Sequence, residues 1–131
     1  MEILIAILQI IYVMGLIVSW VYFLKVELKD PEKTEVYRVF EKSFILPDLG
    51  WCAPCMFLSA LGLLTNQGYW VFFSIAGGSA ILFLFLLDFS FNLQQKTYSK
   101  EKRKENIFEI LLNIFCVIGG PLYMIYGFFN L

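Results

Sequence analysis

Histidine is absent from this sequence of 131 residues, and its absence narrows the chemistry that the chain can perform. Imidazole is the usual general base near neutral pH, the commonest protein ligand of zinc and haem, and the side chain most often used as a pH switch. A catalyst built from this chain would therefore have to use carboxylates, thiols or a bound cofactor.

Charged residues are also scarce, and their signs nearly balance, with ten Lys and Arg against eleven Asp and Glu. Without a basic excess, the sequence gives no reason to expect a nucleic-acid partner. Hydrophobic residues make up 60% of the chain, aromatic residues make up 18%, and the mean hydropathy is +0.73. A water-soluble core of this size could not bury so much apolar surface, so the composition predicts a membrane protein with the lipid bilayer around it.

Four long apolar runs cover residues 3–24, 49–65, 69–91 and 107–129. The first has 22 residues without a charge, and as a helix it would extend roughly 33 Å, enough for a hydrocarbon layer of about 30 Å. That length exceeds the core of a signal peptide, so we expect a retained helix. The second run has 17 residues, near the lower limit for crossing a bilayer. The sequence predicts one all-α domain, residues 1–131, forming a four-helix transmembrane bundle.

The connecting segments predict how these spans are oriented. Residues 66–69 form a short Gly-containing turn of the kind that joins antiparallel helices. All ten Lys and Arg lie within 25–42 and 94–106, and two crossings separate these segments, so both lie on one side. The positive-inside tendency places that side in the cytoplasm, and we expect a multi-pass protein of the cell membrane with both termini extracytoplasmic.

A short amphipathic helix is predicted on the cytoplasmic side, between the first two spans. The string "VYRVFEKSFIL" begins at residue 36 and has apolar residues at near-helical spacing. These residues are Val36, Val39, Phe40 and Phe44.

Polar side chains inside the spans are the candidate functional residues, because an ionisable group at the bilayer centre costs about 2.5 to 3.5 kcal/mol. Helical spacing places several of them on shared faces in the cytoplasmic half of the bundle. The predicted ligand-binding residues are Asp48, Asp88, Asn92, Glu109 and Asn113. If their faces point inward, they form one pocket that could pass protons, bind a cation or seat a polar head group. The alternative is that they only link helices or reach water at the interface.

Two further features of the spans suggest how the helices begin and pack. Asp48 precedes the second apolar run and could act as the N-cap of that helix. Ala76 and Ala80 have the spacing of small residues that lets two helix backbones approach closely.

The string "WCAPC", residues 51–55, offers a second hypothesis about function. Over these five residues the chain resembles thioredoxins and protein disulfide isomerases, and the spacing of Cys52 and Cys55 permits a disulfide. As a membrane bundle with a cysteine pair at a helix start, the chain is similar to quinone-linked oxidoreductases of the DsbB and vitamin K epoxide reductase kind. That resemblance implies Cys52 and Cys55 as a redox pair and a bound quinone. Those families also use a second pair, and here only Cys116 remains. A third possibility is a soft-metal site formed by Cys52, Cys55 and Cys116.

A longer stretch, roughly residues 44–98, resembles an uncharacterised group of small prokaryotic four-helix integral membrane proteins. The likeness rests on a P-D pair before the second helix and on the pattern D-x-x-F-N-x-Q leading to a tyrosine after the third. These positions are Pro47, Asp48, Asp88, Phe91, Asn92, Gln94 and Tyr98. The resemblance implies the fold and adds weight to the polar residues, and it brings no known activity.

We therefore expect a multi-pass membrane protein that is more probably not an enzyme, either an accessory bundle or a small carrier, with a polar pocket on its cytoplasmic side and no cofactor. The alternative is a membrane thiol oxidoreductase that uses Cys52 and Cys55. The ligand would be a small molecule or cation, and a homodimer is a possible assembly, because carriers of this size often need a second copy to enclose a path.

Overall fold

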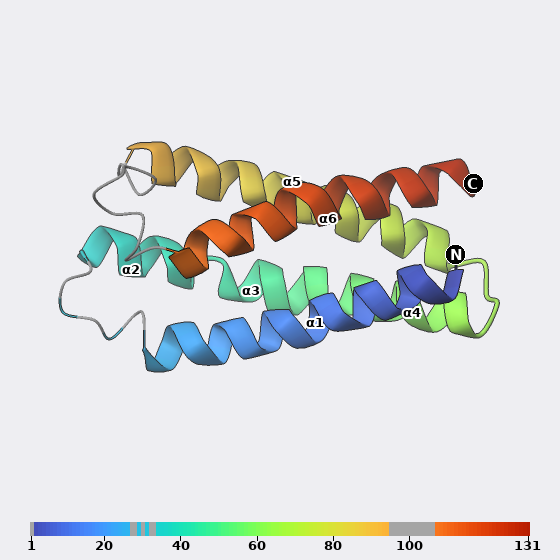
Figure 1. The fold of residues 1–131 in the computed structure, drawn as a ribbon, viewed down its shortest axis with the longest axis horizontal. Coiled ribbons are helices and arrows are strands. Elements are labelled where there is room, and N and C mark those ends of the chain that lie inside the picture. The colour runs from blue at the N-terminus through green and yellow to red at the C-terminus, as the bar shows by residue number, and fades with distance from the viewer. Residues whose placement is uncertain (1, 27–28, 30, 32–33, 95–106) are drawn as a thin grey trace.

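The computed structural model describes residues 2–26, 29, 31, 34–94 and 107–131, without the side chains of residues 108 and 109. All regular structure in these residues is helical, as the sequence predicts, and none of it is strand (Figure 1). The elements are α1 (Glu2–Lys25), α2 (Glu35–Lys42), α3 (Ile45–Pro47), the π-helix η2 (Asp48–Cys52), α4 (Ala53–Leu64), α5 (Trp70–Gln94) and α6 (Ile107–Phe129).

Four helical stretches of the described chain are long and apolar enough to cross a membrane. They are Glu2–Lys25, Glu35–Leu64, Trp70–Gln94 and Ile110–Phe129. Large apolar side chains are exposed along all of them, including Ile11, Phe57, Phe83 and Phe115. Such a surface is unfavourable in water and favourable against lipid. The structure is thus compatible with a multi-pass membrane protein, which agrees with the four predicted spans.

The long helices lie side by side, with α1 against α4 and α5 against both α4 and α6 (Figure 1). Both chain ends and the turn between α4 and α5 lie at one end of the molecule, and α2 lies at the other. The α4–α5 turn is tight, and Asn66 adopts a positive φ of 56° within it. This arrangement confirms that the second and third apolar runs form an antiparallel pair.

The second span is longer than the 17 residues predicted from Leu49. Helical backbone runs from Ile45 through η2 to Leu64, and the whole apolar stretch, with α2, covers 30 residues. Asp48 has helical angles, φ −67° and ψ −52°, so the proposed N-cap role is wrong because the helix is already under way there. Pro54 supplies a physical reason for the wide π-turn before it, because a proline ring crowds the carbonyl four residues earlier.

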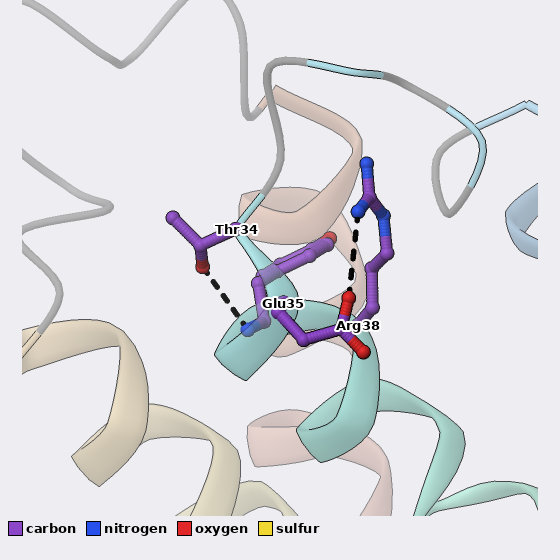
Figure 2. A network of polar contacts seen from close by, with 4 residues as sticks. Thr34, Glu35 and Arg38 are labelled. Atoms are coloured by element: carbon purple, nitrogen blue, oxygen red, sulfur yellow. Dashed lines mark hydrogen bonds and ion pairs between the residues drawn. The ribbon is translucent and has the colours of Figure 1, made fainter.

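The amphipathic segment forms α2, and its start is capped as Figure 2 shows. The Thr34 hydroxyl accepts a hydrogen bond of 3.1 Å from the backbone N–H of Tyr37, and Arg38 lies 3.7 Å from Glu35. Only part of the predicted apolar face packs against the bundle. Val36 and Val39 are exposed, because the helix turns Tyr37 and Glu41 into the protein instead. The side-chain pattern alone did not reveal this rotation.

Aromatic packing joins α2 to the end of α5. The rings of Phe40 and Phe91 stack with their centroids 4.0 Å apart and an angle of 12° between their planes. Phe44, which follows α2, is buried with Trp20 and Phe23 of α1. These contacts hold α2 against the bundle, so that its inner face forms part of the interior.

Glycines, and not the predicted alanines, set the closest helix crossings. A Cβ at Gly78 would lie 2.6 Å from the carbonyl oxygen of Gly120, so the backbones of α5 and α6 touch there. A Cβ at the neighbouring Gly77 would lie 2.9 Å from Cβ of Cys55 on α4. Ala76 and Ala80 are only partly buried. Adjacent residues on α5 thus face two different helices.

A buried polar chain links three helices in the half of the bundle nearer the termini. Nε2 of Gln9 donates to Oγ of Ser74 at 3.4 Å, and that hydroxyl donates to the carbonyl oxygen of Tyr123 at 2.7 Å. Gln9 and Ser74 are fully buried. Interhelical hydrogen bonds of this kind typically contribute about 0.6 kcal/mol each in a membrane, so their main effect is to define the register of α1, α5 and α6.

Candidate ligand pocket

A cavity of about 80 Å³ lies inside the bundle, between α1, α5 and α6 and next to α2 and η2. Six polar side chains line it, and four of them were singled out from the sequence. They are Ser19, Glu41, Asp48, Asp88, Asn113 and Cys116. The rest of its wall is mostly apolar, with aromatic rings from α1, from Phe44 and from α5. Carboxylate, amide, hydroxyl and thiol groups therefore converge on one space from five helical elements.

Asp48 reaches the cavity from the first turn of η2, where it contacts α1. Its Oδ2 accepts a hydrogen bond of 3.0 Å from the indole Nε1 of Trp20. Trp20 itself is buried and also lines the cavity. The indole thus holds one oxygen of the carboxyl group in place at the cavity wall.

Asp88 lies on α5 and is oriented by its own helix. Nδ2 of Asn92, one turn later, donates to Oδ2 of Asp88 at 3.2 Å. Asn92 is fully buried but does not line the cavity. Its role in the geometry is to position Asp88, and the shared face predicted for these two residues is the one that points inward.

The fourth span contributes Asn113 and Cys116, one turn apart on α6. Asn113 is buried, whereas Cys116 is partly buried. Glu109 was predicted to share their face. Its backbone belongs to α6, but its side chain lies outside the part that the structure describes. Tyr98 and the basic run 100–104 likewise fall outside the described residues.

Sequence reasoning missed several residues of the pocket, and Glu41 is the most important of them. Glu41 lies in the polar connecting segment, yet it is 6% exposed and lines the cavity. A signal was present, because Tyr37, Glu41 and Phe44 recur at spacings of four and three and therefore share a helix face. Because this segment was predicted only as an amphipathic helix on the cytoplasmic side, Glu41 was not assigned to the pocket. Trp20 and Ser19 were missed because nothing in an apolar run marks which side faces inward.

The cysteines are unpaired, and two of them are almost completely buried. All three are free, and Cys52 and Cys55 are 0% and 1% exposed, packed between α4 and its neighbours. In this state neither sulfur is accessible to a partner thiol or an oxidant. No group of three Cys, Asp or Glu among the described residues could hold a metal ion, so Cys52, Cys55 and Cys116 have no geometric support as a soft-metal site.

Comparison with protein families, with curated proteins and with solved structures finds no match to this chain. The resemblance to small prokaryotic four-helix membrane proteins therefore stays a prediction. The function must be argued from the pocket itself.

Proposed function

We propose that this protein is a small, non-enzymatic, multi-pass membrane protein that forms a four-helix transmembrane bundle and binds a cation or a proton in its interior pocket. The observation that supports this most directly is the convergence of three carboxyl groups on one cavity. Glu41, Asp48 and Asp88 come from three separate helical elements. Ionised carboxylates only accept hydrogen bonds, and in a poorly hydrated space they favour a positive occupant.

Two of the carboxyl groups accept hydrogen bonds from neutral donors. Asp48 accepts from a neutral indole and Asp88 accepts from a neutral amide. These two contacts orient one oxygen of each carboxyl group. A cation that enters the cavity meets preorganised oxygens, and a proton can be held on the same groups. The pocket lies within one chain, so a second copy is not required to build it, and a homodimer stays a prediction.

The orientation that we propose is the one predicted by the basic residues. The pocket is nearer the end that carries α2, and the positive-inside tendency makes that end cytoplasmic. Both termini and the α4–α5 turn would then lie outside the cell. A cysteine introduced at Gly68 should react with a membrane-impermeant maleimide in intact cells, and one introduced at Thr34 should react only after lysis. The reverse pattern would refute this orientation.

The test of the pocket is the Asp88→Asn variant. The amide keeps the size of the side chain and an oxygen that can accept from Asn92, but it removes the charge. Thermal unfolding of the purified protein in detergent is measured as cation concentration and pH are varied. A ligand at ten times its Kd stabilises the folded state by about 1.4 kcal/mol, and we expect Asp88→Asn to lose that stabilisation.

The matched control is Glu35→Gln, which neutralises a carboxylate of α2 that is exposed and outside the pocket. This variant should respond to cations and pH as the wild type does. If Asp88→Asn also responds like the wild type, the proposed function is wrong.

A further inference from the structure

This inference rests on the proposed cation pocket and concerns the chemical class of its ligand. We propose that the occupant is a small organic ammonium ion and not a metal ion. Three features of the cavity carry the argument: carboxylates that come from different helical elements, an aromatic wall, and a volume larger than one metal ion needs.

The three carboxylates that line the cavity, Glu41, Asp48 and Asp88, come from α2, η2 and α5. No group of three acidic or thiol side chains in the described chain could hold a metal ion. Asp48 is held against α1 by Trp20, and Asp88 is held along α5 by Asn92. A protein site for Ca²⁺ or Mg²⁺ needs several oxygens at about 2.0 to 2.6 Å from one centre. Separated carboxylates suit a larger cation, whose charge is spread over its surface.

Aromatic rings supply most of the remaining wall. Tyr12, Trp20, Phe23, Phe44 and Phe85 all line the cavity. The negative face of an aromatic ring attracts an ammonium ion, and such rings form the usual binding cages for quaternary ammonium groups. The same rings offer a dry, apolar contact to alkyl groups, whereas they replace none of the water lost by a small metal ion.

Ser19 adds a hydroxyl to the polar part of the cavity wall. It lies on α1, is 8% exposed and lines the cavity. None of the hydrogen bonds between described residues uses its hydroxyl. A polar group of a bound ligand could form a hydrogen bond with this hydroxyl.

The size of the cavity agrees with this ligand class. A space of about 80 Å³ exceeds what one water needs, which is roughly 10 to 15 Å³ by the same measure. It suits a molecule of a few heavy atoms. A single dehydrated metal ion would leave most of it empty.

The experiment compares tetramethylammonium chloride with sodium and magnesium chlorides at equal ionic strength. Thermal unfolding of the purified protein in detergent gives an apparent Kd for each cation. The variants are Asp88→Asn, for the charge, and Phe85→Leu, for the aromatic wall. The matched control for the second is Phe83→Leu, because Phe83 lies on the same helix but is 63% exposed and outside the cavity.

We expect tetramethylammonium to stabilise the wild type more than either metal salt does. Loss of one cation–π contact should weaken its binding about three- to thirtyfold in Phe85→Leu and leave Phe83→Leu unchanged. Equal binding by these two variants would overturn the inference. Should only metal ions stabilise the protein, through Asp88, the inference fails and the proposed function stands. If the protein responds to pH through Asp88 but to no added cation, the inference also fails and the proposed function stands. With no response that depends on Asp88, both fail.

Discussion

The indole Nε1 of Trp20 donates a hydrogen bond of 3.0 Å to Oδ2 of Asp48, which lies 28 residues further along the chain. This contact joins the last turns of α1 to the π-turn of η2 and positions a carboxylate on the wall of the interior cavity. It also explains how an acidic side chain is accommodated inside a helical stretch long enough to cross a membrane. The pairing makes Trp20 a positioning residue for the pocket.

Trp20→Phe should therefore destabilise the fold through the loss of this hydrogen bond. The variant keeps an aromatic ring but removes the donor, and we expect a loss of about 1 to 2 kcal/mol in the free energy of unfolding. Unfolding in mixed detergent, followed by circular dichroism, measures it. The control is Trp51→Phe, at a position that is 47% exposed. Equal stabilities of the two variants would contradict the role assigned to the Trp20 indole.

Gly78→Ala should lower the free energy of unfolding although it adds only one methyl group. The added methyl group would lie 2.6 Å from the carbonyl oxygen of Gly120 and 2.7 Å from the backbone nitrogen of Met124, and backbone atoms cannot move aside as a flexible side chain can. We expect a loss of about 1 to 3 kcal/mol, measured by the same unfolding assay.

Gly15→Ala is the matched control for this prediction, because nothing lies within 4 Å of the Cβ position at Gly15 in α1. Alanine favours a helix interior over glycine, so this variant should be neutral or slightly more stable. If Gly78→Ala unfolds no more easily than Gly15→Ala, then α5 and α6 do not cross as closely as the structure shows.

The thiols of Cys52 and Cys55 should be protected from modification in the folded protein. Both are almost completely buried. A membrane-permeant maleimide should leave them unmodified in native membranes, and denaturation in dodecyl sulfate should make them reactive. Alkylation followed by intact-protein mass measurement detects the difference. If untreated membranes yield a trapped Cys52–Cys55 disulfide, and Cys52→Ser causes loss of function, the oxidoreductase hypothesis is the better one.

Much of the candidate site could be predicted from residue types, because polar groups are rare and costly in a membrane helix. Asp48, Asp88, Asn113 and Cys116 stand out in apolar surroundings, and the structure brings them to one cavity. The spacing of Asp88 and Asn92 placed them on one helix face, and the tertiary structure decided that this face points inward. The aromatic residues of the pocket could not be predicted. Trp20 and Phe85 look like many other aromatic residues of this chain until the helices are packed.

The small residues show the same limit. Ala76 and Ala80 have the right spacing for a helix crossing, yet Gly77 and Gly78 make the close contacts. Both pairs lie on α5, and the choice between them depends on how that helix is rotated towards α4 and α6. A helix that is apolar on all sides carries no pattern that selects its buried face.

The sequence by itself determined the all-helical fold, the number of long apolar helices and the short list of polar groups within them. These features can be predicted locally. The free energy of placing a helix in lipid is roughly the sum of the contributions of its consecutive residues, so each apolar run and each polar group within it is visible in the sequence. The tertiary structure alone decided that Glu41 turns inward, that Asp48 meets Trp20 and that Cys52 and Cys55 are buried. Those outcomes depend on the rotation and register of each helix. Contacts between residues far apart in the sequence set both, so they cannot be derived from any one segment.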